Sequence, residues 1–142
     1  MALVVDASVA VKWLVVEEGS DDARDLLDDG EELHAPRLLV SEVANAIWRK
    51  VQLGQVDRSA AGRLIATMSD TPVRWHADET IGADAIRLAI ARDRPVYDFM
   101  YLALAQRLNA RVVTADQRFV NALSSTSHSD LVVPLIDPAG HR

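Results

Sequence analysis

Short hydrophobic runs alternate with longer amphipathic stretches along the 142 residues of this chain. Three of the runs are rich in β-branched residues, as are the buried strands of parallel sheets. They predict strands at Ala2–Asp6, Arg111–Thr114 and Leu131–Ile136. Weaker signals, each next to a proline, predict strands at Leu33–Ala35 and Val73–Trp75. The hydrophobic pattern therefore predicts four to five strands spread over the whole chain.

Apolar residues with helical spacing fill the segments between these strands. The predicted helices, in chain order, are Ser8–Val15, Asp21–Asp29, Pro36–Leu53, Asp57–Met68, Thr80–Ala91, Asp98–Leu108 and Gln117–Leu123. In the longest of them, Pro36 fits the first turn and Gly54 fits the stop. Strands that alternate with helices predict an α/β fold built on a parallel sheet with right-handed crossovers. Ligands of such sheets bind outside the carboxyl ends of the strands, at the topological switch point.

The length and composition fit one globular domain over residues 1–142. Hydrophobic residues make up 49% of the chain and charged residues 25%, and no linker or repeat divides it. The absence of cysteine excludes disulfides, thiolate metal sites and cysteine nucleophiles. The apolar opening is interrupted by Asp6 and Lys12 and lacks a basic leader, so we expect neither a signal peptide nor a membrane span. A cytoplasmic location fits these features.

The net charge of −6 is concentrated in one segment. Residues 17–32 carry nine acids and one base, whereas the other 126 residues carry 12 acids and 14 bases. We interpret the acidic segment as a solvated helix face. An acidic protein is usually a poor partner for nucleic acid, but the remaining surface of this chain is free to meet phosphates.

Three aspartates are candidates for a metal site. Asp6 ends the first predicted strand, Asp116 follows the strand Arg111–Thr114, and Asp98 opens a nearly all-apolar helix. If the two strands are central and parallel, Asp6 and Asp116 emerge at the same edge of the sheet. Grouped carboxylates repel one another unless a cation neutralises them, and oxygen ligands suit Mg²⁺ or Mn²⁺. Aspartate is also a favoured N-cap, so capping alone is the alternative interpretation for all three.

A fourth acid, Glu42, lies inside the helix Pro36–Leu53. The apolar stripe of this helix comprises Val40, Val43, Ala44, Ile47 and Val51. Glu42, Asn45 and Arg49 share the opposite face. We expect that face to be solvated, and it allows Glu42 to point into a cleft.

Four segments of the chain together resemble a known family. They read LVVDASV from Leu3, SEVANAIWR from Ser41, VYDFMYLALA from Val96 and VVTADQRF from Val112. In this order and spacing they resemble the PIN-domain ribonucleases, and specifically the VapC-type toxins of bacterial toxin–antitoxin pairs. The resemblance implies a PIN-like α/β/α sandwich with a central parallel sheet of four to five strands.

The resemblance also implies a set of site residues. It matches the four acids of the PIN motif, in order, to Asp6, Glu42, Asp98 and Asp116. Ser8 and Thr114 match hydroxyl positions that help to arrange the site. Some relatives carry a fifth acid three residues after the fourth, where this chain has Phe119, and this departure argues against a second tightly bound metal.

Family members cleave RNA with Mg²⁺ or Mn²⁺, and the resemblance implies the same chemistry here, with metal-activated water attacking the phosphodiester. We expect Asp6 and Asp98 to be direct ligands, followed by Asp116, with Glu42 acting through water. One or more of these acids would orient and deprotonate the attacking water. Four bases lie close to the motifs in sequence and are candidates for RNA phosphate contacts: Lys12, Arg37, Arg49 and Arg118.

Partners follow from the same resemblance. VapC-type toxins bind a VapB-type antitoxin, a segment of which packs against helices near Val9–Val15, and they commonly form homodimers. The apolar character of that segment, which includes Trp13 and Leu14, predicts a surface that one small domain does not cover fully.

Other functions have less support from the residues. The four histidines are scattered without metal-ligand spacing, so a histidine general base is a minor alternative. The DASV segment resembles the phosphatase signature of the haloacid dehalogenase superfamily, but Ser8 replaces its second acid. The alternative from another class is a PIN-like binding module that contacts RNA or protein without cleaving it. Acids at all four motif positions argue against that alternative, because binding alone would not need them.

Overall fold

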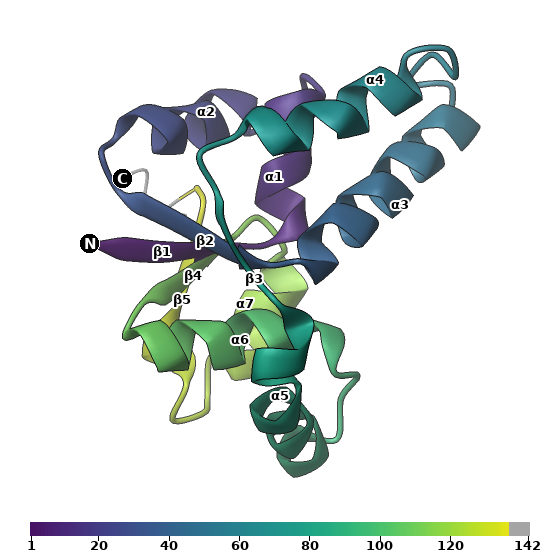
Figure 1. Cartoon of the computed structure of the whole chain (residues 1–142). Coiled ribbons are helices and arrows are strands. Elements are labelled where there is room, and N and C mark those ends of the chain that lie inside the picture. Colours follow the sequence, from purple (N-terminus) through teal and green to yellow (C-terminus); the bar gives the residue numbers. More distant parts are fainter. Residues whose placement is uncertain (137–142) are drawn as a thin grey trace.

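The computed structural model describes residues 1–136, which form a five-stranded parallel sheet with helices on both faces (Figure 1). The strands are β1 (Ala2–Val5), β2 (Glu32–Pro36), β3 (Arg74–His76), β4 (Arg111–Thr114) and β5 (Val132–Pro134). Their order across the sheet is β3-β2-β1-β4-β5, and every neighbouring pair is parallel. The chain builds outwards from β1 to β3 and then returns to place β4 on the other side of β1. The topological switch point therefore lies between β1 and β4.

Helices form a layer on each side of this sheet. They are α1 (Ala7–Leu14), α2 (Ser20–Asp28), α3 (Leu38–Gln52), α4 (Ala61–Ala66), α5 (Asp78–Arg92), α6 (Tyr97–Leu108) and α7 (Gln117–Leu123). Short 3-10 turns occur at Thr67–Asp70 and Ser129–Leu131. Helices α1 to α4 lie on one side of the sheet, whereas α5 and α6 lie on the other (Figure 1). The predicted α/β/α sandwich is confirmed.

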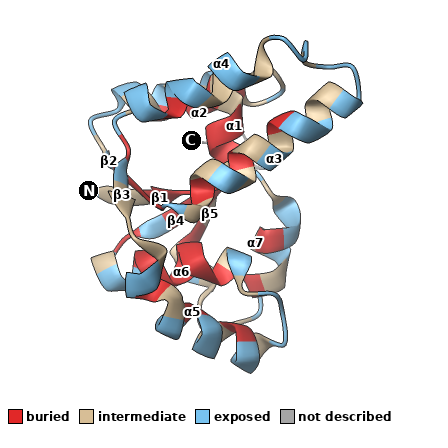
Figure 2. Ribbon diagram, turned by 45° about the vertical axis from the view of Figure 1, so that its right-hand side comes forward, coloured by how far each residue is buried: buried red, intermediate tan, exposed pale blue. Residues whose placement is uncertain are grey.

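The layer that contains α6 holds much of the hydrophobic core. All seven residues from Phe99 to Ala105 are buried, because α6 packs between α5 and the strands β1, β2 and β4 (Figure 2). The nearly all-apolar sequence of this helix reflects that position. Asp98 is thus the charge at the N-terminal end of a buried helix. None of the helices in residues 1–136 is long and apolar enough to cross a membrane.

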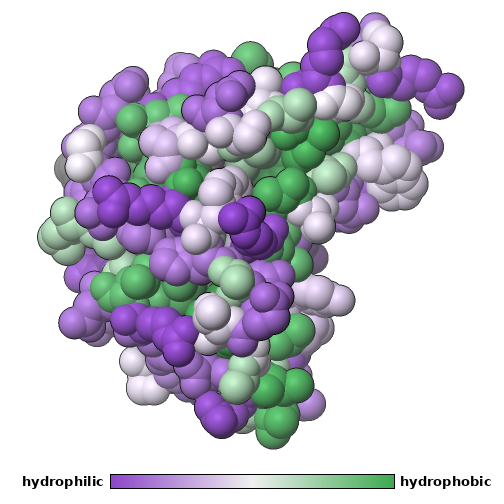
Figure 3. Space-filling view, in the orientation of Figure 1, coloured by the Kyte–Doolittle hydropathy of each residue, from purple (hydrophilic) through white to green (hydrophobic). Residues whose placement is uncertain are grey.

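The long helix α3 and the short helix α4 pack against each other and project from the sheet as an arm (Figure 1). The space-filling view shows the same arm at the upper right, with hydrophobic surface where it meets the body of the molecule (Figure 3). The polypeptide leaves the helix at Gly54, whose φ of 74° is readily adopted by glycine. The predicted stop at Gly54 is therefore confirmed.

Two helices begin at least two residues later than predicted. Pro36 is the last residue of β2, paired in register with His76, and α3 begins two residues later at Leu38. Proline at the end of a strand costs little, since no further ladder bond is needed from its missing N–H. The helix predicted from Asp57 begins only at Ala61, because residues 57–60 form a turn.

The expectation that apolar surface is left uncovered around Trp13 is wrong for Trp13 itself. Its side chain is buried, and its indole N–H donates a hydrogen bond of 2.7 Å to the carbonyl oxygen of Ala23 in α2. The residue of this region that remains uncovered is Val16, which is 80% exposed. The helix α2 places most of its acidic side chains at the surface, as predicted for a solvated face.

Candidate active site

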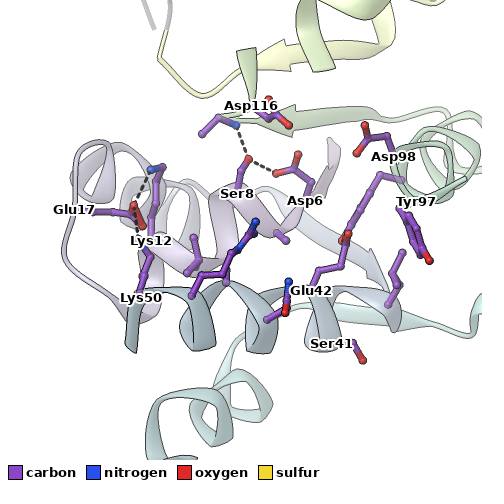
Figure 4. A pocket seen from close by; sticks show the side chains of 18 of the residues that line it. Asp6, Ser8, Lys12, Glu17, Ser41, Glu42, Lys50, Tyr97, Asp98 and Asp116 are labelled. Atoms are coloured by element: carbon purple, nitrogen blue, oxygen red, sulfur yellow. Dashed lines mark hydrogen bonds and ion pairs between the residues drawn. The ribbon is translucent and has the colours of Figure 1, made fainter. Parts of the chain in front are cut away.

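A cleft of about 740 Å³ opens at the carboxyl edge of β1 and β4 and continues between α1 and α3 (Figure 4). All four acids of the motif line it: Asp6, Glu42, Asp98 and Asp116. Asp6 follows β1 and Asp116 follows β4, whereas Glu42 comes from α3 and Asp98 from α6. Four elements that are far apart in the sequence thus deliver one carboxylate each to the switch point of the sheet.

Asp6 is buried and held by three donors. Its Oδ1 accepts hydrogen bonds from Ser8 Oγ at 2.6 Å and from the backbone N–H of Val9 at 3.3 Å, and its Oδ2 accepts one from Thr114 Oγ1 at 2.5 Å. A carboxylate offers about four lone-pair sites. Roughly one acceptor direction is therefore left for a ligand in the cleft. Ser8 and Thr114, which the resemblance matched to hydroxyl positions, are thus the two side chains that hold Asp6.

The same two hydroxyls join the ends of β1 and β4. Ser8 Oγ accepts a hydrogen bond of 2.8 Å from the N–H of Ala115, and Thr114 Oγ1 accepts one of 3.0 Å from the N–H of Asp116. The two oxygens lie 3.2 Å apart, but each hydroxyl donates its single proton to Asp6, so neither donates to the other. This network fixes the relative positions of Asp6 and Asp116.

Two of the aspartates both cap a helix and line the cleft. Asp6 is the N-cap of α1, and Asp116 is the N-cap of α7 through a hydrogen bond of 3.0 Å from the N–H of Arg118. Asp98 differs, because Val96 is the N-cap of α6 and Asp98 lies one residue inside the helix. Its carboxylate is free of a capping role.

Glu42 points into the cleft and is bound by Tyr101, a residue that the sequence analysis did not select. The hydroxyl of Tyr101 donates a hydrogen bond of 2.5 Å to Glu42 Oε1. Tyr101 lies on α6 three residues after Asp98, and residues at this spacing share a helix face. That spacing was the available signal, but the surrounding apolar run made Tyr101 look like a core residue.

Burial raises the pKa of three of the acids. The pKa of Asp6 rises from its ordinary 3.8 to about 6, since burial outweighs the hydrogen bonds from Ser8, Thr114 and Val9, and the charge of Asp98 adds a smaller increase. Burial and then the charge of Asp116 raise the pKa of Asp98. The pKa of Glu42 is also raised, by burial and less by Asp98, against the hydrogen bond from Tyr101. Desolvation, rather than repulsion, is thus the main reason that negative charge is unfavourable here.

The candidate RNA-binding bases fall into two groups. Lys12 and Arg49 line the cleft, as does Lys50, which the sequence analysis did not select. Arg37 is exposed outside the lining. Arg118, with its side chain 92% exposed, lies 3.7 Å from Asp116 Oδ1 at the rim. The structure therefore brings Lys12 and Arg49 to the cleft and leaves Arg37 apart from it.

Phe119, at the place of the fifth acid of some relatives, is buried in the core and offers no ligand atom. His34 and His76 lie 2.9 Å apart, Nδ1 to Nε2, but neither lines the cleft. Their contact joins β2 and β3, which explains why the sequence spacing of 42 residues gave no signal. His141 lies outside the described residues. A histidine general base at the acidic cleft has no support from this arrangement.

The donor set of the cleft fits a hard divalent cation. Its carboxylates supply oxygen ligands, and burial makes their charge unfavourable without a cation. Within residues 1–136, no three acidic or histidine side chains are arranged so that they could hold a metal ion by themselves. Mg²⁺ usually takes one or two carboxylates and completes its octahedron with waters and phosphate oxygens, so the cleft suits such a partly open site.

The family model of the PIN domain matches residues 3–122. This chain belongs to the PIN-domain family. The matched region contains β1 to β4 and all four acids of the cleft. The match to this PIN domain therefore includes the four sequence segments that carry the acids of the cleft: Asp6, Glu42, Asp98 and Asp116.

Relatives of this PIN domain carry VapC names. Ribonuclease VapC3 of Pyrobaculum aerophilum is 31% identical over 120 residues, which cover 83% of this chain and 92% of that protein. The crystal structure of PAE2754 from the same organism has a TM-score of 0.70 at 22% identity, covering 95% of this chain and 90% of that one. The structure of VapBC2 from Rickettsia felis, bound to a DNA fragment from their promoter, has a TM-score of 0.64 at 8% identity, covering 94% and 98%. The two structures show the shared fold, and the VapC resemblance is confirmed.

Proposed function

We propose that this PIN domain is a metal-dependent endoribonuclease that acts as the toxin of a toxin–antitoxin pair. The observation that carries the proposal is the delivery of four carboxylates, from four separate elements, to one cleft at the switch point. A ribonuclease name for the relative that is 31% identical supports the reaction class.

The proposed cofactor is Mg²⁺ or Mn²⁺, with Asp6 and Asp98 as direct ligands, Asp116 next and Glu42 acting through water. When bound, such an ion lowers the pKa of its water and neutralises charge that builds on the phosphate. The chain itself supplies the geometry. Ser8 and Thr114 hold both oxygens of Asp6, so that its remaining lone pair faces the cleft.

Glu42 is the candidate base for orienting the attacking water. Tyr101 fixes its Oε1, which leaves Oε2 to accept a proton or a hydrogen bond. Because burial raises the pKa of Glu42, its carboxylate is a better proton acceptor than an exposed glutamate. The tyrosine stays protonated, since burial and the charge of Glu42 raise the pKa of its hydroxyl.

RNA is the proposed substrate, with Lys12 and Arg49 contacting phosphates inside the cleft and Arg118 at its rim. Arg37 stays a weaker candidate because it lies outside the lining. Cations that contact phosphates position the strand without reading its bases. We therefore expect these cations to bind RNA of any sequence, and the shape of the cleft to determine which RNA is cleaved.

A VapB-type antitoxin is the proposed protein partner, and a homodimer the proposed oligomer. Exposed large hydrophobic side chains support a protein partner at the cleft: Leu53 lines it, and Val16 and Trp48 adjoin the lining residues Glu17 and Arg49 in the sequence. A second exposed apolar surface on α5, with Ile86 and Ile90, suits self-association. The VapBC2 structure with the same fold supports an antitoxin as the class of partner.

The test is cleavage of a panel of structured RNAs, including total tRNA and ribosomal RNA, by the purified protein. Cleavage is expected with Mg²⁺ or Mn²⁺ and is lost in EDTA and in the variant Asp98→Asn. Cleavage that persists in EDTA would refute the metal-dependent reaction. Binding without cleavage of any RNA would favour the binding module instead.

A further inference from the structure

The end of the cleft away from Asp98 contains two lysines bridged by one carboxylate (Figure 4). Glu17 Oε2 lies 3.6 Å from Lys12 Nζ and 3.2 Å from Lys50 Nζ. Lys12 comes from α1, Lys50 from the last turn of α3, and Glu17 from the loop between α1 and α2. The cluster thus joins the end of α3 to α1 and the loop that follows it.

This cluster is more enclosed than an ordinary surface ion pair. The side chains of Lys12, Lys50 and Glu17 are only 13%, 17% and 26% exposed. Glu17 Oε1 is buried and accepts no hydrogen bond from residues 1–136. A buried oxygen without a donor is an unfavourable contact. Both lysines therefore have a charged partner in Glu17, whereas one carboxylate oxygen of Glu17 has no hydrogen-bond donor among residues 1–136.

Lys12 is held in place independently of Glu17. Its Nζ donates a hydrogen bond of 2.7 Å to the carbonyl oxygen of Glu18. Its stem passes over Gly19, where an added Cβ would come within 3.3 Å of the Lys12 Cδ and Cε atoms. The ammonium group thus keeps its position at the cleft if the Glu17 side chain moves away.

We propose that Lys12 and Lys50 form a binding subsite for a backbone phosphate of RNA, and that Glu17 occupies this subsite until the phosphate displaces it. The inference rests on the proposed ribonuclease function and adds Lys50 and Glu17 to it. A backbone phosphodiester carries the same single negative charge as Glu17, and its two non-bridging oxygens can accept from both ammonium groups at once. Displacement also frees the buried Oε1 of Glu17 to reach water.

The helices fix how far the subsite lies from the acids. Lys12 is one turn after Ser8 on α1, and Lys50 is eight residues after Glu42 on α3. At a rise of 1.5 Å per residue these separations are about 6 and 12 Å. A phosphate in the subsite is therefore one or two nucleotides away from the phosphate at the acids. One continuous cleft joins the subsite to the acids, so a single RNA strand can occupy both.

The test compares Glu17→Gln with Glu18→Gln, which removes the same charge from the same loop at an exposed position. The substrate is a short single-stranded RNA that the wild-type protein cleaves, and KM and kcat are measured over a range of salt. Glu17→Gln is expected to lower KM about fivefold at low salt with kcat unchanged, whereas Glu18→Gln stays close to wild type. Lys50→Gln is expected to raise KM and to reduce the salt slope of binding by about 0.7 for a single strand.

Each outcome decides one point. Equal KM values for Glu17→Gln and Glu18→Gln, or an unchanged salt slope in Lys50→Gln, would overturn the subsite while wild-type cleavage still supports the ribonuclease. Absence of cleavage by the wild type on every RNA would overturn the proposed function itself. A tighter complex of Glu17→Gln with a short polyglutamate peptide, and no change toward RNA, would assign the subsite to protein and refute the phosphate proposal. If Glu17→Gln does not fold, Lys50→Gln alone decides.

Discussion

Replacing Asp6 by asparagine is expected to stabilise the metal-free protein at pH 7. Burial raises the pKa of Asp6 from 3.8 to about 6. That difference corresponds to about 3 kcal/mol of unfavourable free energy for the ionised side chain at neutral pH. Asparagine has the same shape and caps helices about as well as aspartate. The substitution therefore removes the buried charge and keeps the cap of α1.

The hydrogen-bond network accommodates the amide of the Asp6→Asn variant. The amide oxygen would accept from Ser8 Oγ and the N–H of Val9, and the amide nitrogen would donate to Thr114 Oγ1. The Thr114 hydroxyl would then donate to Ser8 Oγ, 3.2 Å away. The hydroxyl and backbone donors keep their partners and the second amide hydrogen is left facing the cleft, while the short contact between Thr114 and the carboxylate is replaced by a weaker one. We expect a net gain of about 1–2 kcal/mol, since charge-assisted hydrogen bonds are roughly twice as strong as neutral ones.

The stability difference between Asp6→Asn and wild type should depend on pH. The folded protein binds the Asp6 proton more tightly than the unfolded chain does, so this contribution to stability is fully present below pH 3.8. It is lost as the pH rises through about 6. The advantage of Asp6→Asn over wild type should therefore shrink by roughly 2 kcal/mol between pH 7 and pH 4.5.

Urea unfolding of both proteins in EDTA at the two pH values measures this difference. In Mg²⁺ we expect wild type, rather than the variant, to be the more stable protein. At free metal about 100 times the dissociation constant, wild type should gain roughly 2.7 kcal/mol. The variant lacks a ligand and should gain much less. The placement of Asp6 as a buried metal ligand would be refuted by either of two results. One is a difference in stability between variant and wild type that is the same at pH 7 and pH 4.5. The other is equal stabilisation of both proteins by Mg²⁺.

Three further substitutions test other parts of the site. Thr114→Val should destabilise the protein by about 1–3 kcal/mol at pH 7, because Asp6 Oδ2 loses its only donor within residues 1–136; thermal melts that show no loss would contradict the network. Tyr101→Phe should lower kcat for RNA about tenfold with little change in KM, since Glu42 loses the donor that orients it, and unchanged steady-state kinetics would remove Tyr101 from the site. Expression of the wild-type chain alone should arrest bacterial growth, and Asp98→Asn at a matched protein level should not; equal growth of the two cultures would count against a catalytic toxin.

The fold and the positions of the acids were predictable because their signals are local. The β-branched runs before Asp6 and Asp116 become adjacent parallel strands, so two residues 110 positions apart end at the same edge of the sheet. The start of α3 was predicted too early because proline fits both the first turn of a helix and the last position of a strand, and Pro36 ends β2. Only the pairing with β3 decides between these two positions.

The contacts that orient the acids were not predictable in the same way. The hydrogen bond between Tyr101 and Glu42 joins α6 to α3 over 59 residues, and the ion pair between Glu17 and Lys50 spans 33. Periodicity assigns each residue to a face of its own helix but does not determine which neighbouring helix that face meets. Trp13 shows the same limit, since its apolar character did not reveal that α2 would cover it.

The double role of Asp6 and Asp116, as N-caps and as acids of the cleft, has a consequence for the genetics of a toxin. Selection for survivors should recover different spectra of inactivating changes at the different acids. At Asp6 and Asp116, a single-base change to asparagine removes the carboxylate and preserves the helix start, whereas most other replacements also weaken the fold. Asp98 caps nothing and should accept a wider range of residues. Survivors with asparagine at position 6 or 116 should then accumulate as folded, inactive proteins that still bind the antitoxin and remove it from any active copy in the same cell.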